Sequence, residues 1–379
     1  MTRESAPDDA GGAREGDGAL AGMLVVDFST LTPGPLASLF LAEAGADVVK
    51  IERPGGDEMR AREPRLGPDS AQFALLNRGK RSVVADLKAP GAFDRLRGLI
   101  ERADVILEQF RPGVMARLGF GYDAVRAINP RIVYCSLTGY GQSGPRAQVA
   151  GHDLNYVAES GLLSLGIAAD GSPAIPAALV GDIAGGTYPA VINIALALLR
   201  RERTGEGAYL DISMADNLAP FMAGPLARGL GGGDWPAPRM GDLTGASPRY
   251  RTYATRDARR LAVGALEDRY WSNFCDTIGL DADVRKSLAK DALIEAVAAR
   301  VAARTAEEWQ RAFAGVDACV SLVRTLPEVA GAACGGDFGR VVAGGDALPA
   351  LCVPIASSLR REGGDRPAPA LGESGRHGG

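Results

Sequence analysis

The sequence predicts an α/β protein with a large, Rossmann-like parallel-sheet domain and a smaller α+β domain. In the first half, short apolar runs alternate with helical stretches, which is typical of parallel strands with helices on both faces. In the second half, a hairpin pattern at 250–266 is followed by helical stretches, which predicts a separate unit. The length of 379 residues and the hydrophobic fraction of 46% are sufficient for two cores.

Apolar runs predict the strands of the large domain, and the stretches between them predict its helices. The predicted strands are 24–28, 47–51, 83–86, 105–107, 132–136 and 209–213. The predicted helices are 36–44, 90–102, 122–128, 153–164, 181–203 and 214–230. Ligands of such sheets bind outside the carboxyl ends of the strands. No G-x-G-x-x-G motif follows the first strand, so the large domain lacks a dinucleotide motif.

Two strands, Tyr250–Thr255 and Leu261–Leu266, and helices around 269–280 and 291–315 predict the smaller domain. A stretch rich in glycine and proline precedes them and indicates a linker. The predicted organisation is a disordered leader at 1–20, a large domain at 21–228, a linker at 229–248, a small domain at 249–325, and a C-terminal segment at 326–379 that returns to the large domain and has a disordered tail.

Charge and composition argue against several classes of function. The net charge of −4 argues against a protein that binds nucleic acid by neutralising phosphates. Five cysteines without a C-x-x-C motif indicate reduced thiols and no zinc site. No apolar run in the sequence reaches the length of a membrane span, and the N-terminus is not a signal peptide. We therefore expect a cytoplasmic protein whose partners include neither membrane nor nucleic acid.

The chain has only two histidines, and one of them, His377, lies three residues from its end. The other, His152, follows Gly151 at the start of a predicted helix. Imidazole is the usual group for proton transfer near neutral pH, and the positive end of a helix dipole favours the neutral ring, which suits a base. A surface or capping histidine is the alternative for this position.

Two carboxylates are candidates for the same chemistry. Asp182 stands at the start of the long predicted helix among glycines that leave room for a ligand, although Asp at this position is also a common helix cap. Glu267 ends an apolar strand, where a lone glutamate is usually solvated. Glu267 becomes a functional candidate if it lies beside a histidine, because a carboxylate that accepts a hydrogen bond from an imidazole raises the basicity of that imidazole.

Basic residues fall near the ends of several predicted strands or in the loops after them. They are Arg53, Arg78, Lys80, Arg81, Lys88, Arg111 and Arg117. Most surface arginines bind nothing, but a cluster at the ligand-binding edge of a parallel sheet is consistent with phosphates, as in coenzyme A or a nucleotide.

Five glycine-containing segments complete the pattern. They are Leu107-Glu-Gln-Phe-Arg-Pro-Gly-Val114, Leu118-Gly-Phe-Gly121, Thr138-Gly-Tyr-Gly-Gln-Ser-Gly-Pro145, Gly151-His-Asp-Leu-Asn-Tyr156 and Gly181-Asp-Ile-Ala-Gly-Gly186. Together they resemble the class III CoA-transferase superfamily, over about residues 22–330. The combination of His152 with Glu267 resembles the racemases of that superfamily that act on 2-methylacyl-CoA thioesters, because its transferases typically lack this histidine.

The resemblance implies a role for each candidate residue. His152 and Asp182 would be the acid/base groups on opposite faces of the substrate α-carbon, and Glu267 would orient His152. The family forms interlocked homodimers, so Glu267 would act across the interface. The implied coenzyme A contacts are Arg53, Ala85, Asp86, Leu87, Lys88, Gln109, Phe110, Arg111, Arg117, Gly151, Asp153, Leu154, Asn155 and Tyr156. Coenzyme A is then part of the acyl-CoA substrate, and no separate cofactor or metal is expected.

The chemistry implied in this way is removal of the α-proton, formation of an enolate, and return of a proton to the other face. The alternative is a CoA-transferase that moves coenzyme A from an acyl-CoA to a free carboxylic acid with Asp182 as nucleophile. A CoA-binding protein without catalysis is the third hypothesis. The sequence departs from the family at Leu243–Arg251 and Asp268-Arg269, near the expected acyl site, so these segments bear on the substrate.

Overall fold

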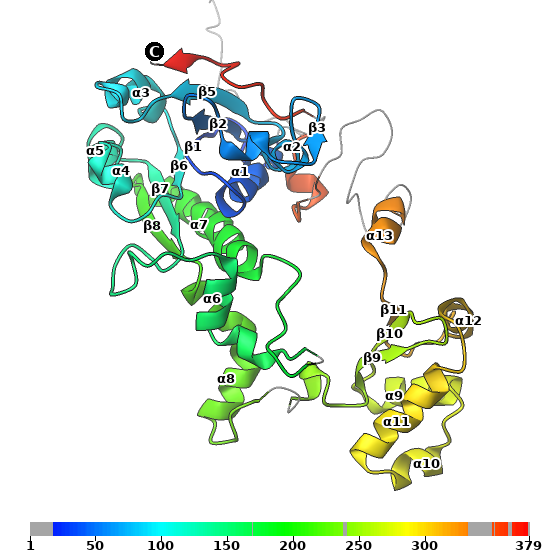
Figure 1. Ribbon diagram of the computed structural model, residues 1–379. Coiled ribbons are helices and arrows are strands. Elements are labelled where there is room, and N and C mark those ends of the chain that lie inside the picture. The colour runs from blue at the N-terminus through cyan, green and yellow to red at the C-terminus, as the bar shows by residue number, and fades with distance from the viewer. Residues whose placement is uncertain are drawn as a thin grey trace, which may run out of the picture. The chain divides into compact units, whose positions relative to one another are not determined.

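The computed structural model describes residues 18–168, 170–237, 241–332, 351, 353–362 and 366–377 (Figure 1). The chain divides into two compact units. The first comprises Met1–Tyr156, Ala178–Leu218 and Ala333–Gly379, and the second comprises Val157–Ala177 and Ala219–Ala332. The predicted leader at 1–20 lies almost wholly outside the described residues.

A seven-stranded sheet, all of whose described pairs are parallel, forms the centre of the first unit. Its strand order is β12-β5-β2-β1-β6-β7-β8, so the order reverses at β1. The strands are β1 (Leu24–Asp27), β2 (Asp47–Glu52), β5 (Arg81–Ala85), β6 (Val105–Glu108), β7 (Val133–Thr138), β8 (Ala208–Ser213) and β12 (Arg376–His377). The α/β fold class expected from the sequence is thereby confirmed.

Helices cover both faces of this sheet, which explains why its central strands are mostly apolar on both faces. On one face, Val26, Val49 and Ile106 pack with α3 (Ala92–Ile100) and α5 (Tyr122–Ile128). The helix α1 (Pro33–Glu43) contacts the same strands, and α7 (Tyr188–Thr204) contacts α1 and the neighbouring strands β7 and β8. Their described residues are not part of that cluster, so they cover the opposite face. The other helices of this unit include α2 (Ala71–Asn77), α4 (Val114–Arg117), α6 (Asp153–Glu159), which runs into the second unit, the 3₁₀ helices η1 (Glu58–Ala61) and η6 (Ser357–Leu359), and the π-helix η3 (Gly181–Thr187).

The second unit contains the hairpin that the sequence predicts. The strands β9 (Tyr250–Ala254), β10 (Arg260–Gly264) and β11 (Val320–Leu322) form an antiparallel sheet. Against it pack α9 (Asp268–Thr277), α11 (Lys290–Val301) and α12 (Ala306–Ala312), and the short α10 (Ala282–Ser287) joins α9 to α11. The core of this unit is centred on Trp271, Phe274 and Trp309, each at most 6% exposed.

Three predicted helices are wrong in their extent. The stretch 291–315 splits into α11 and α12, because Thr305 begins a new helix in a capping box with Glu308. The stretch 153–164 ends at Glu159, and Gly161, with a φ of 88°, precedes the separate 3₁₀ turn η2 (Leu162–Leu165). The stretch 214–230 consists of the 3₁₀ segment η4 (Asp216–Met222), which contains Pro220, and α8 (Ala223–Leu230).

The last described residues form structure where the sequence shows no pattern. Arg376 and His377 make β12, which pairs in parallel with β5 at one edge of the large sheet. A two-residue strand is held by backbone hydrogen bonds and shows no periodicity, so the sequence cannot indicate it. Of the predicted linker at 229–248, the described part contains the short 3₁₀ turn η5 (Asp242–Thr244).

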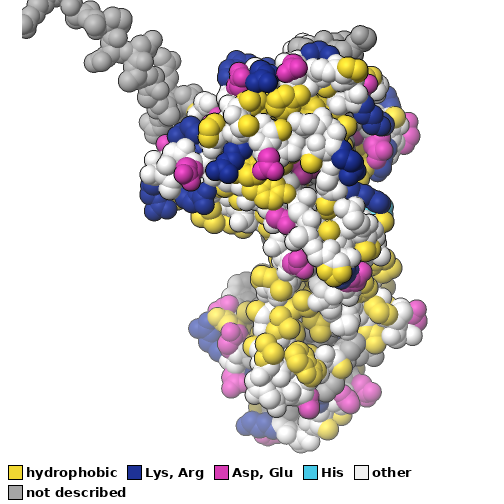
Figure 2. Space-filling model, turned by 90° about the vertical axis from the view of Figure 1, so that its left-hand side faces the viewer, with side chains coloured by type: hydrophobic (Ala, Val, Ile, Leu, Met, Phe, Trp, Pro, Cys, Tyr) yellow, Lys and Arg dark blue, Asp and Glu magenta, His cyan; other side chains and the backbone are white. Residues whose placement is uncertain are grey.

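The continuous helix Gly181–Thr204 is long and apolar enough to cross a membrane by length and composition, which the sequence analysis did not anticipate. Core helices of soluble proteins meet the same criterion, and α7 packs on β7, β8 and α1. Its other side is exposed and apolar, with Ile192, Leu196 and Leu199 between 56% and 63% exposed. Hydrophobic side chains are also visible on part of the surface shown in Figure 2.

Candidate active site

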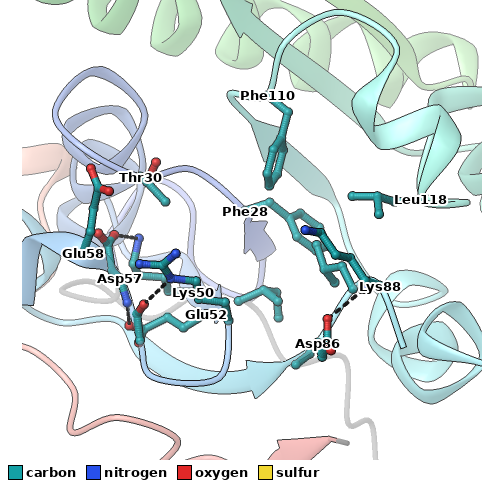
Figure 3. Close-up of a pocket in the computed structure, with 15 residues that line it drawn as sticks. Phe28, Thr30, Lys50, Glu52, Asp57, Glu58, Asp86, Lys88, Phe110 and Leu118 are labelled. Atoms are coloured by element: carbon teal, nitrogen blue, oxygen red, sulfur yellow. Dashed lines mark hydrogen bonds and ion pairs between the residues drawn. The ribbon is translucent and has the colours of Figure 1, made fainter. Parts of the chain in front are cut away.

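A pocket of about 320 Å³ lies at the carboxyl edge of the large sheet (Figure 3). Its walls come from the ends of β1, β2, β5 and β6 and from the loops after them. The strand order reverses between β1 and β6, which is the position where ligands bind in open parallel sheets. The lining residues are Phe28, Thr30, Lys50, Ile51, Glu52, Arg53, Gly56, Asp57, Glu58, Ala85, Asp86, Leu87, Lys88, Phe110 and Leu118.

The pocket combines an apolar wall with charged groups. In Figure 3, Phe28, Phe110 and Leu118 lie on one side, and the charged side chains of Lys50, Asp57 and their neighbours lie on the other. Arg53 and Lys88 are exposed residues of the lining. An apolar slot with a few convergent polar groups is typical of a small-molecule site.

Buried ion pairs hold the loop that forms one wall of the pocket. Lys50 is fully buried, and its Nζ lies 2.9 Å from Oδ2 of Asp57 and 2.7 Å from the carbonyl oxygen of Ser29. Arg60 donates two hydrogen bonds of 2.7 Å to the carboxylate of Glu52. Burial alone would raise the pKa of Glu52, but the hydrogen bonds from Arg60 and Ser82 outweigh it and lower that pKa. The loop 53–58 is therefore anchored at both ends.

The sequence analysis did not identify Lys50, Asp57 or Glu52 as part of the site. The available signal was a lysine inside the apolar run 47–51, where a charge is expected only if it is paired. Glu108 does not line the pocket, but its carboxylate accepts a hydrogen bond from the N–H of the lining residue Phe110. Glu108 is 3% exposed at the end of β6, and burial raises its pKa to about 7 in spite of a hydrogen bond from Ser136.

The two candidate bases stand at the starts of two helical segments of the first unit. His152 is exposed and directly precedes α6, and its backbone N–H donates to Oδ1 of Asn155 at 3.0 Å. Asp182 is the second residue of η3, and its backbone N–H donates to Oδ1 of Asp153 at 2.8 Å. The helix starts that the sequence predicts for both residues are present.

The electrostatic surroundings of Asp182 suit proton transfer. Its pKa is raised to about 6, first by burial and then by the negative charge of Asp153, while the charge of His152 acts in the opposite direction. The imidazole and the carboxylate therefore lie within electrostatic reach of each other. A carboxyl group that titrates near neutral pH can both remove and return a proton.

The structure divides the predicted coenzyme A contacts into two groups. Arg53, the segment 85–88 and Phe110 line the pocket, and Gln109, Arg111 and Arg117 are sequence neighbours of lining residues. Gln109 Oε1 accepts a hydrogen bond of 3.1 Å from the N–H of Gly34. The second group does not line the pocket and surrounds the candidate bases instead: Gly151, Asp153, Leu154, Asn155 and Tyr156.

The other basic residues near the strand ends are engaged in ion pairs. Arg78 lies 2.9 Å from Glu43, and Lys80 lies 3.5 Å from the buried Asp27. Arg81 pairs with Asp47. None of the three lines the pocket, because they precede or begin β5 rather than follow it.

Glu267 belongs to the second unit, where it occupies the position before α9 and is exposed. It makes no side-chain capping bond. Its pairing with His152 stays a prediction. Within the described residues, no group of three or more His, Cys, Asp or Glu side chains is arranged to hold a metal ion.

The chain belongs to CoA-transferase family III, whose family model matches residues 20–375. It is 39% identical to alpha-methylacyl-CoA racemase of Homo sapiens over 316 residues, which are 82% of this chain and 79% of that protein. It is 36% identical to acetyl-CoA:oxalate CoA-transferase of Acetobacter aceti over 264 residues, 69% of this chain and 67% of that protein. The crystal structure of a CaiB/BaiF family protein from Brucella suis matches with a TM-score of 0.82 and 28% identity, over 95% of this chain and 98% of that one.

The raised pKa of Asp182 predicts a pH-dependent stability. Unfolded aspartate titrates near pH 3.9, as an approximate model value, whereas folded Asp182 titrates at about 6. Its contribution to stability is therefore fully present below roughly pH 4 and is lost as the pH rises through about 6. Replacing Asp182 with Asn removes this loss, so the melting temperature of the variant should rise relative to wild type between about pH 4 and 7.

Thermal unfolding followed by circular dichroism across this pH range measures the effect. Asp94→Asn, on the exposed face of α3, is the matched control and should follow wild type at every pH. A constant difference between Asp182→Asn and wild type would show that this carboxyl group titrates normally.

Proposed function

We propose that this protein is a racemase that interconverts (2R)- and (2S)-2-methylacyl-CoA thioesters. The observation that carries the proposal is the pair of candidate bases. His152 and Asp182 begin two neighbouring helical segments of one unit, and the pKa of Asp182 is raised to about 6. Two groups that exchange protons near neutral pH are what a two-base racemisation needs.

In this mechanism one base removes the α-proton of the thioester and the other returns a proton to the opposite face. The intermediate enolate needs hydrogen-bond donors for its oxygen. The N–H groups of His152 and Asp182 are already engaged, by Asn155 and Asp153. Those of Asp153 and Leu154, in the first turn of α6, have no acceptor among the described residues, so we assign the enolate oxygen to them.

The pocket at the carboxyl edge would hold the nucleotide end of coenzyme A. Phe28, Phe110 and Leu118 offer an apolar wall for the adenine, and the exposed Arg53 and Lys88 offer cations for the phosphates. Arg111 links this pocket to the bases, because it follows Phe110 and its charge acts on Tyr156.

A CoA-transferase is the second candidate, and two observations favour keeping it. One is the similarity to acetyl-CoA:oxalate CoA-transferase. The other is the half-buried carboxylate of Asp182, which could attack a thioester. The racemase is preferred because the transferase mechanism gives His152 no task.

The pocket predicts that coenzyme A binding depends on arginine. Arg53→Ala and Arg111→Ala should each weaken acyl-CoA binding by about 10- to 100-fold, the loss of one charge-assisted hydrogen bond. Isothermal titration with coenzyme A measures this, with Arg97→Ala on the exposed side of α3 as the control. Unchanged affinity in both variants would remove these arginines from the binding site.

The two-base mechanism predicts different losses for the two substrate enantiomers. His152→Ala and Asp182→Ala should each reduce racemisation by on the order of 10²- to 10⁴-fold, because each leaves one face without a proton carrier. In deuterated water, each variant should still exchange the α-proton of one enantiomer with retention of configuration. Mass spectrometry and chiral chromatography of the product measure both. A transferase would instead lose acyl exchange in Asp182→Ala and retain it in His152→Ala.

We also propose that the protein is a homodimer in which Glu267 of one chain meets His152 of the other. The exposed apolar side of α7 offers a surface for a second copy. Light scattering at micromolar concentration should give twice the mass of one chain. After co-refolding, His152→Ala and Glu267→Ala chains should recover part of the activity, because a hybrid dimer has one intact site. A fully active monomer would rule this out.

A further inference from the structure

Two side chains of α6 reach the segments that carry the candidate bases. Asp153 Oδ1 accepts the hydrogen bond of 2.8 Å from the backbone N–H of Asp182. The hydroxyl of Tyr156 donates a hydrogen bond of 2.6 Å to the carbonyl oxygen of Gly151, the residue before His152. The side chains of α6 are thereby hydrogen-bonded to the backbone at or next to both candidate bases.

Three glycines of the sequence motifs make these contacts possible. A Cβ atom on Gly139 or Gly151 would lie 2.5 Å or 2.7 Å from the ring of Tyr156. A Cβ atom on Gly181 would lie 3.0 Å from the carbonyl oxygen of Asp153 and 3.2 Å from Cβ of Tyr156. A side chain at Gly139 or Gly151 would therefore displace the Tyr156 ring, and one at Gly181 would crowd the first turn of α6.

Tyr156 is poorly placed to contact a ligand. It is 5% exposed, and its ring packs edge-on against Tyr140 with 5.2 Å between the ring centres. Burial and the nearby charge of Asp182 raise its pKa to about 12, so the hydroxyl keeps its proton and its donor role at every working pH.

The charge of Asp153 acts directly on Asp182. Besides burial, Asp153 raises the pKa of Asp182, and His152 lowers it.

The titratable groups on the other elements packed against η3, which are α1, α7 and β8, bear on the same carboxyl group. The segment 33–42 of α1 contains no titratable side chain, and Glu43 pairs with Arg78. In β8, Asp211 accepts hydrogen bonds from the N–H of Gln142, and Tyr209 donates to Ser136. In the first turns of α7, Tyr188 is the titratable residue.

We propose that the side chains of Asp153 and Tyr156 are positioning groups, which lock His152 and Asp182 into one rigid unit, rather than contacts of coenzyme A. Asp153 fixes the backbone of Asp182 and keeps its carboxyl group able to hold a proton near neutral pH. Tyr156 fixes the peptide before His152 and fills the space between the three glycines. The roles of the two bases rest on the proposed function, but the contacts that hold them do not.

Two conservative variants test the proposal. Asp153→Asn keeps an oxygen that can accept from Asp182 and removes only the charge. Tyr156→Phe keeps the ring and removes only the hydroxyl. Asp94→Asn and Tyr122→Phe, on α3 and α5, are the matched controls.

The kinetic readout separates positioning from binding. For the enantiomer that Asp182 deprotonates, the pH profile of kcat should fall on its acid side at about pH 6 in wild type. In Asp153→Asn this fall should move toward the ordinary aspartate pKa of about 4. In Tyr156→Phe, kcat should fall by about 10- to 100-fold, because small displacements of catalytic groups are costly in rate. The dissociation constant of each variant for coenzyme A, measured by titration, should lie within about two-fold of the wild-type value. The loss of one strong contact would raise it by about tenfold. An affinity loss of tenfold or more with unchanged kcat and pH profile would identify them as coenzyme contacts and overturn the proposal.

Two further readouts need no activity, so failure of the proposed function can be distinguished from failure of this inference. The fall in melting temperature between about pH 4 and 7 that Asp182 imposes should be smaller in Asp153→Asn than in wild type. Amide hydrogen exchange in residues 139–156 should be faster in Tyr156→Phe than in wild type and in Tyr122→Phe. If neither readout changes, the two side chains do not position the bases, whatever reaction the wild-type protein catalyses.

Discussion

The pairing of charges buried beneath the carboxyl edge of the sheet is the constraint on which the rest of the site depends. Lys50 and Asp57 are both nearly inaccessible and lie 2.9 Å apart, and Glu52 is held by Arg60 in the same layer. Removing one partner of such a pair leaves an uncompensated charge in the interior, at a cost of about 3–5 kcal/mol. The loop between β2 and η1 (Glu58–Ala61) is therefore fixed in place, and with it one wall of the pocket.

The candidate site extends from this anchored pocket along the loops after successive strands. The pocket uses the ends of β5, β2, β1 and β6, and the bases follow β7. The amide of Gln148, in the loop before His152, donates a hydrogen bond of 3.1 Å to the carbonyl oxygen of Pro112, in the loop after β6. Because the carboxyl ends of parallel strands meet at one edge of a sheet, the pocket and the loop that leads from β7 to His152 lie at the same edge.

The sequence predicted the fold wherever burial produces a pattern. The central strands are mostly apolar because helices cover both faces, so their runs were visible, and α5 was placed at its observed limits. The pattern did not reveal β12, which depends on backbone pairing, or the break between α11 and α12, which depends on the cap at Thr305. Residue chemistry made His152 and Asp182 candidates, and their roles remain predictions. It did not reveal the buried partners of Lys50 or the contacts of Asp153 and Tyr156, because these depend on which loops meet in space.

One reaction tests the central claim most directly. The wild-type protein is incubated in deuterated water with a single enantiomer of a 2-methylacyl-CoA and an isotopically labelled free carboxylic acid. The account predicts that one deuterium enters at the α-carbon, that configuration is lost, and that the labelled acid gains no coenzyme A. Transfer of coenzyme A to the labelled acid, with no deuterium at the α-carbon and the configuration retained, would contradict the account and assign the reaction to a CoA-transferase.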